Sequence, residues 1–323
     1  MDKIHRRNRQ GLSFSFAIFV IMFALVSCSD DSHDSPAPAS MQIQDPQGEN
    51  TQVDENTGQQ EQEPSGSAII IDHANTDIDA IPQEWIEQAK QDLHIAYGHT
   101  SHGSQITTGM TGLAGFKGSL YAYNGGGSGG ALDLRDKPFS GAEDLGSPNR
   151  TAWAAATRSY LDLHPEINVV MWSWCGQADT TPENINLYLT AMESLEDDYP
   201  EVDFVYMTGH LMGTGLQGNL HLRNEQIRQF CRANGKILYD FEDIESYDPD
   251  GAYYGDKYAD DACNYDSNGD RTNDANWAAA WQNSHAEGVD WYECEAAHTE
   301  PLNANLKAYA AWWLWAKLAG WNG

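Results

Sequence analysis

Three short stretches of the chain combine residue types that serve in catalysis. Residues 98–105 read GHTSHGSQ, residues 174–177 read WCGQ, and residues 295–298 read EAAH. Hydroxyl, thiol and imidazole groups act as nucleophiles and bases in acyl transfer, and a carboxylate can orient the base. These stretches are therefore the first candidates for a reactive site.

Apolar runs alternate with helical patterns around these stretches. Strands that alternate with helices build a parallel sheet covered on both faces, so we expect an α/β fold of three layers, α/β/α. Ligands bind beyond the carboxyl ends of the strands in such sheets, and the first two polar stretches follow expected strands while the third precedes the last expected helix. The expected strands are 68–71, 93–98, 167–174, 202–207 and 236–241, and the expected helices are 82–91, 152–163, 182–195, 224–233 and 303–319.

A serine after the first core strand and an acid-x-x-His before the last helix resemble the SGNH hydrolases, also called the GDSL type. The resemblance covers most of residues 90–323 in layout rather than in extended identity. It implies a flavodoxin-like parallel sheet and a serine esterase whose chemistry requires no cofactor. It also implies that Ser101 attacks an ester carbonyl, that His298 activates the serine, and that Glu295 orients the histidine.

The sequence departs from the family pattern in three places. The first block is Gly98-His99-Thr100-Ser101 where the family has Gly-Asp-Ser, which leaves Ser104 as a rival nucleophile. No asparagine marks the oxyanion hole, and Gly176 and Gln177 are the nearest donors. The acid of the last block is Glu where the family has Asp.

Other residues at the strand ends allow two interpretations. Ser101 could cap the helix that follows it. His99 and His210 are candidate substrate contacts or hydrogen-bonding residues of the core, and with His102 they form a candidate zinc site. Trp172 and Trp174 alternate along one strand and so share a face, where they either pack in the core or stack against a sugar. The candidate site thus includes His99, His210, Trp172, Trp174, Gly176 and Gln177 beside the three reactive residues.

Four of the cysteines lie beyond the N-terminal segment. An even number in an exported chain favours disulfides. Cys263 and Cys294 flank an acidic insertion, so we expect them to pair. Cys175 and Cys231 would then be a second pair or remain thiols. A thiol nucleophile at Cys175 is the alternative to the serine.

The acidic insertion covers about residues 244–290. One of its loops places side-chain oxygens at alternate positions and then a glycine, as the first half of an EF-hand does. Its twelfth position is Ala275, where an EF-hand has a bidentate Glu. We expect a structural Ca²⁺ ion here, with a solvated acidic loop as the alternative. The predicted ligands are Asn264, Asp266, Asn268 and Asp270.

The charge balance limits the partners. The chain has 18 Lys and Arg against 48 Asp and Glu, a formal net charge of −30. Phosphate contacts need clustered basic residues, so the balance argues against nucleic acid and against attachment to anionic lipid by charge. A polysaccharide or another ester is the expected substrate. The alternative function is a surface glycan-binding protein that has the same fold without catalysis.

The N-terminal segment predicts export. Basic residues precede an apolar run, which ends in Leu25-Val26-Ser27-Cys28. This ending resembles the lipobox of bacterial lipoproteins, in which the cysteine carries the lipid. We expect a signal peptide at 1–27, an acidic tether at 28–67 and the hydrolase domain at 68–323. The lipid anchor would hold the protein in the bacterial cell envelope, at the outer membrane or the cell surface.

Replacing the lipid-carrying residue tests this prediction. Cys28→Ala should release the protein from membrane fractions or block its processing, because no thiol remains to carry diacylglycerol. Fractionation and gel migration of the variant beside wild type measure the effect. If the two proteins fractionate and migrate alike, Cys28 is not an anchor.

Overall fold

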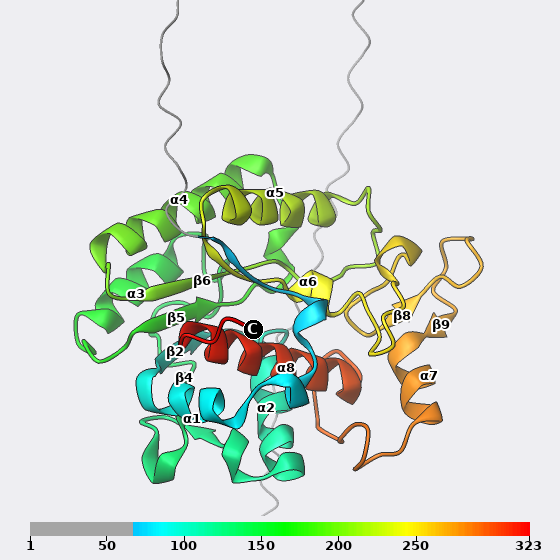
Figure 1. Cartoon of the computed structure of the whole chain (residues 1–323). Coiled ribbons are helices and arrows are strands. Elements are labelled where there is room, and N and C mark those ends of the chain that lie inside the picture. The colour runs from blue at the N-terminus through cyan, green and yellow to red at the C-terminus, as the bar shows by residue number, and fades with distance from the viewer. Residues whose placement is uncertain (1–66) are drawn as a thin grey trace, which may run out of the picture. The chain divides into compact units, whose positions relative to one another are not determined.

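A seven-stranded parallel sheet forms the centre of the computed structural model, which describes residues 67–323 (Figure 1). The strand order is β1-β7-β6-β5-β2-β4-β3. The chain passes from β2 outward to the edge strand β3, returns through β4 beside β2, and then crosses to β5 on the other side of β2. The strands are β1 (Ile69–Ile71), β2 (His94–Gly98), β3 (Tyr123–Asn124), β4 (Leu132–Asp136), β5 (Val169–Trp172), β6 (Asp203–Met207) and β7 (Ile237–Tyr239).

Helices cover both faces of the sheet, which confirms the expected three-layer α/β/α, flavodoxin-like fold (Figure 1). One face carries α1 (Gln83–Asp92), α2 (Ser104–Lys117) and α8 (Pro301–Leu318). The other carries α3 (Ala152–Leu161), α4 (Pro182–Asp198) and α5 (Asn219–Ala233). No helix among residues 67–323 has the length and apolar character needed to cross a membrane. The predicted signal peptide, Cys28 and most of the tether lie outside the described residues.

Two close approaches set the packing around β2. At Gly109, α2 lies directly against the backbone of α8, where a Cβ atom would collide with the Ala304 carbonyl oxygen. At Gly98, the last residue of β2, a Cβ atom would overlap the ring of Trp172. Both positions require glycine because another backbone or ring occupies the space of a side chain.

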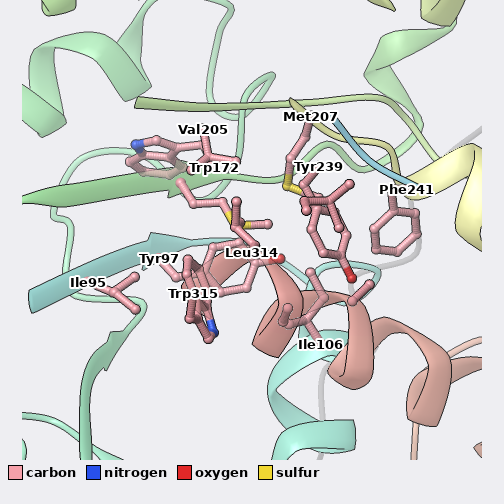
Figure 2. Close-up of a cluster of buried hydrophobic side chains, with 14 of the residues drawn as sticks. Ile95, Tyr97, Ile106, Trp172, Val205, Met207, Tyr239, Phe241, Leu314 and Trp315 are labelled. Atoms are coloured by element: carbon pink, nitrogen blue, oxygen red, sulfur yellow. The ribbon is translucent and has the colours of Figure 1, made fainter. Parts of the chain in front are cut away.

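Aromatic side chains fill the core on both faces. Tyr97, Leu314 and Trp315 lie together between β2 and α8 (Figure 2), and all three are almost fully buried. On the opposite face Trp172 contacts the ring of Trp153 from α3. Burial of side chains of this size supplies most of the hydrophobic stabilisation of such a fold.

The expected bridge between Cys263 and Cys294 is absent, which corrects that prediction. Both residues are thiols in the structure. Cys263 Sγ lies 3.4 Å from Thr299 Oγ1, and Cys294 Sγ lies 3.8 Å from the Pro301 carbonyl oxygen. Burial raises the pKa of each thiol to about 12, so both stay protonated at neutral pH. Cys263 lies within the insertion and Cys294 follows it, but the side chain of each turns toward the start of α8.

The acidic insertion folds into β8 (Asn264–Tyr265), β9 (Ala275–Asn276) and α7 (Trp277–Ser284). The predicted calcium ligands accept hydrogen bonds within it. Asp266 accepts the backbone N–H groups of residues 268, 269, 270 and 271. Burial acts to raise the pKa of Asp266, but these four donors outweigh it and lower the pKa. The side-chain oxygens of Asn264, Asn268 and Asp270 also accept N–H donors. The loop is therefore held by its own backbone, and calcium binding stays a prediction.

Thermal melting can distinguish the role of Asp266 in holding the loop from its predicted role as a calcium ligand. Asp266→Ala should lower the melting temperature more than Asp270→Ala, because Asp266 accepts four N–H groups of the loop and Asp270 accepts one. Equal shifts would contradict this account of the loop. The same melts with EGTA and with added Ca²⁺ test the ion, since a ligand of the folded state raises the melting temperature. If neither addition has an effect, calcium has no part here.

Candidate active site

Side chains from three strand ends and two distant loops meet at the carboxyl edge of the sheet. His102 follows β2, Cys175 follows β5 and His210 follows β6. Asp261 comes from the acidic insertion, and His298 comes from the segment before α8. The meeting point lies beside β2, where the strand order reverses and where sheets of this kind bind their ligands.

His102 connects a thiol to a carboxylate. Its Nδ1 lies 3.4 Å from Cys175 Sγ, and its Nε2 lies 3.0 Å from Asp261 Oδ2. Since a carboxylate only accepts, the proton of the neutral ring belongs on Nε2, and Nδ1 is left to accept from the thiol. A nucleophile within reach of a base that a third group orients is the signature of an activated nucleophile.

The three histidines form a stack with His102 in the middle. The His210 ring lies 3.7 Å from that of His102 and is tilted by only 3°. The His298 ring lies 4.5 Å away on a 15° tilt. His210 and His102 are buried, whereas His298 is exposed, so the site opens to solvent on the His298 side.

Burial sets the charge of the stack. It lowers the pKa of all three imidazoles, and the neighbouring rings lower the pKa of His102 and His298 further. Burial also acts to raise the pKa of Asp261, but the hydrogen bond with His102 and the nearby imidazoles outweigh it and lower the pKa. At neutral pH the site therefore holds neutral rings around one carboxylate.

A buried ion pair supports the loops that carry two of the histidines. Lys307 of α8 lies 2.6 Å from Glu245, and both side chains are completely buried. Lys307 also donates to Gln105 of α2. Glu245 accepts the backbone N–H of Leu211, next to His210, and Gln105 donates to the carbonyl of Ala297, next to His298, at 2.7 Å. One ammonium group thus connects both loops.

The loop after β2 is fixed by two further carboxylates. His99 Nε2 lies 2.5 Å from Asp136, and the Thr100 hydroxyl donates to Asp144 at 2.9 Å. Asp144 also accepts the backbone N–H groups of residues 146 and 147. His99 is 2% exposed, so it is a hydrogen-bonding residue of the core rather than a substrate contact.

The predicted serine triad is only partly assembled. Ser101 is half-buried next to His102, and Glu295 is exposed. Among residues 67–323, no hydrogen bond joins His298 to Ser101 or Glu295. The rival Ser104 donates to the Ser101 carbonyl at 2.6 Å, so its hydroxyl serves the turn that begins α2. The structure brings His298 to His102 instead, and the roles of Ser101 and Glu295 stay predictions.

The predicted oxyanion residues lie beside Cys175. Gln177 Oε1 accepts the backbone N–H of Cys175 at 3.1 Å. This contact uses the amide oxygen, so the NH₂ group of Gln177 remains a donor. Gly176, between them, has open space around its Cα atom.

The two tryptophans belong to the core, which corrects the sugar-stacking interpretation. Trp172 is 2% and Trp174 is 3% exposed. Their indole N–H groups donate to the Thr157 hydroxyl at 2.9 Å and to the Met207 carbonyl at 3.0 Å. With both faces and the polar edge of each ring engaged inside the protein, neither offers a surface to a sugar.

Asp261 was not predicted from the sequence. It is one acid among many in the insertion, and only the folded chain distinguishes it. Its backbone N–H donates to the Leu211 carbonyl, and Asp260 pairs with Met212 in an isolated antiparallel bridge. These contacts place the insertion against the loop after β6 and bring Asp261 to His102.

Comparisons with known proteins add no relative. Neither protein-family models nor curated protein sequences gave a match to this chain. The fold class is thus established by the structure, while the resemblance to SGNH hydrolases depends on layout alone.

Removing the charge of Lys307 should destabilise the protein strongly. Lys307→Met leaves Glu245 buried without its partner, which costs about 3–5 kcal/mol of the free energy of unfolding. Lys317→Met on the same helix is the matched control, because its ammonium group donates only to the Asn322 carbonyl at the surface. That variant should stay within about 0.5 kcal/mol of wild type.

Urea denaturation measures both variants. The double variant Lys307→Met with Glu245→Gln should recover part of the loss, since no buried charge remains. Equal stability of the Lys307 and Lys317 variants would contradict the role given to the ion pair.

Proposed function

We propose that the protein is a hydrolase of acyl bonds, with Cys175 as nucleophile, His102 as base and Asp261 as the residue that positions the base. The supporting observation is the position of His102, which lies within hydrogen-bond reach of both the thiol and the carboxylate. The roles are those expected from the SGNH resemblance, but a neighbouring set of side chains fills them. An ester is the simplest substrate class.

The reaction begins with proton transfer from the Cys175 thiol to His102 Nδ1. Sulfur then attacks the carbonyl carbon, and the carbonyl electrons move to oxygen. The NH₂ group of Gln177 would donate to that oxyanion. When the intermediate collapses, His102 gives its proton to the leaving alkoxide and an acyl-enzyme remains. Water, deprotonated by the same ring, releases the acid and restores the thiol.

The surroundings suit this chemistry. Cys175 is only 2% exposed, so the substrate and the water that releases the acid must both enter from the exposed His298 side. The neutral state of His102 allows it to accept a proton at neutral pH. The exposed His298 side is the direction from which a substrate would approach. We propose a polysaccharide ester as the substrate and the cell envelope as the location. The buried tryptophans are not part of a sugar-binding surface.

Nucleophile identity is tested with an activated acetyl ester. Cys175→Ala should lower kcat by about three orders of magnitude or more, as loss of a nucleophile does elsewhere. Cys294→Ala, a half-buried thiol that lies away from His102, is the matched control and should retain activity. Peptide mapping after inactivation by an alkylating agent should locate the label on Cys175.

Ser101→Ala distinguishes the two nucleophiles. Full activity of this variant supports Cys175. If Ser101→Ala is inactive and Cys175→Ala is active, the serine mechanism predicted from the sequence is correct. If wild type binds glycans but hydrolyses no ester, the glycan-binding alternative replaces the hydrolase.

Asp261 should affect turnover without affecting binding. Asp261→Asn keeps the shape of the side chain but no longer selects the Nε2–H tautomer of His102, so kcat should fall by about two to four orders of magnitude with little change in KM. Asp261→Glu should restore part of the rate. Asp270→Asn is the control, because Asp270 also lies in the insertion and its side chain accepts only the backbone N–H of Thr272. A change in KM alone would contradict a positioning role.

A further inference from the structure

We propose that the histidine stack also binds a divalent transition metal ion such as Zn²⁺, and that the bound metal switches off the hydrolase. The donors are His102, Asp261 and His298, with His210 beside them. The proposal that metal binds is based on the geometry of these side chains alone. The proposal that metal inhibits hydrolysis rests on the proposed function.

Three donor atoms already lie close together. Ligand atoms of His102, Asp261 and His298 all fall within 4.8 Å of one another. Zn²⁺ takes imidazole nitrogen and carboxylate oxygen at about 2.0–2.2 Å, which puts tetrahedral ligands about 3.3 Å apart. His102 Nε2 and Asp261 Oδ2, at 3.0 Å, are near that spacing. Only His298 has to approach, and it lies exposed on a loop.

His210 supplies an independent observation. Its Nδ1 donates to the Leu211 carbonyl at 2.9 Å, which leaves Nε2 as an acceptor. His210 is only 7% exposed, so this nitrogen is buried, and it has no hydrogen-bond partner among residues 67–323. Buried acceptors are normally paired, so this lone pair remains available to a metal ion or to a water bound to one. A ring fixed through its other nitrogen is the usual arrangement of metal-binding histidines.

A second cluster shows what a satisfied site looks like. Asp72, His73 and Asp243 also lie within ligand distance of one another. There, however, Asp72 accepts the backbone N–H of Ala74, and Asp243 accepts both the backbone N–H and the ring of His73. Each of these three side chains has a hydrogen-bond partner, and none has a buried polar atom without one. The histidine stack differs in this respect.

A metal ion bound at the histidine stack would change which ring nitrogen of His102 carries the proton. The ion takes the Nε2 lone pair, so the single proton of the neutral ring moves to Nδ1. Nδ1 then donates toward Cys175 Sγ and cannot accept the thiol proton. No proton is gained or lost overall, yet the base of the proposed reaction is gone. Metal binding and hydrolysis therefore exclude each other.

Co²⁺ reports binding through its visible absorption, and Zn²⁺ displaces it. The full chain should bind one Co²⁺ and show visible bands that Zn²⁺ abolishes. His298→Gln and Asp261→Asn should each weaken binding by at least about tenfold. His285→Gln is the matched control, because His285 stacks on Trp281 away from the site. No binding by wild type, or equal binding by all variants, would overturn the proposal.

Ester hydrolysis with rising Zn²⁺ tests inhibition separately. Turnover by wild type should fall in step with metal occupancy and recover when a chelator is added. Metal binding with undiminished turnover would overturn the inhibitory half and also argue against His102 as base. Metal binding by a protein that hydrolyses no ester in the presence of chelator would remove the proposed function while leaving the metal site in place.

Discussion

The ammonium group of Lys307 is fully buried, and the arrangement of the site depends on how its charge is satisfied. A charge away from water must be paired and hydrogen-bonded, or it neutralises. Glu245 and Gln105 meet this need, and each then uses its remaining polar atom on a backbone group of a different loop. The hydrogen bonds that satisfy the buried Lys307 charge therefore also fix the loops that carry His210 and His298.

This arrangement also explains why the reactive groups are neutral rings around a single anion. Lys307 pairs with Glu245 inside the core, and its charge also acts to lower the pKa of Asp261. Asp261 is left to hold His102, and burial keeps the imidazoles uncharged. The electrostatics of the candidate site in this acidic protein are thus set locally, by which groups are buried and which are paired.

Much of the fold follows from the sequence, because apolar runs and turn residues are local signals. The run 93–98 became β2, 202–207 became β6, and 303–319 corresponds to α8 within two residues at its start. The edge that carries His102, Cys175 and His210 was also expected, since strand ends point one way in a parallel sheet. Asp261 was not expected as the partner of His102, because it reaches His102 only when a long insertion folds back on the loop after β6. The burial of Trp172 and Trp174 likewise depends on how the neighbouring helices α3 and α4 pack against the sheet.

The connection through Lys307 also has a consequence for the order in which the protein is made. Lys307 and Gln105 are 202 residues apart, and Lys307 lies on the last helix of the described chain. During synthesis from the N-terminus, the sheet strands emerge while Glu245 still has no cation, and its buried position is unfavourable until α8 arrives. The loops that carry His210 and His298 therefore reach their final positions only when this last helix packs against the sheet.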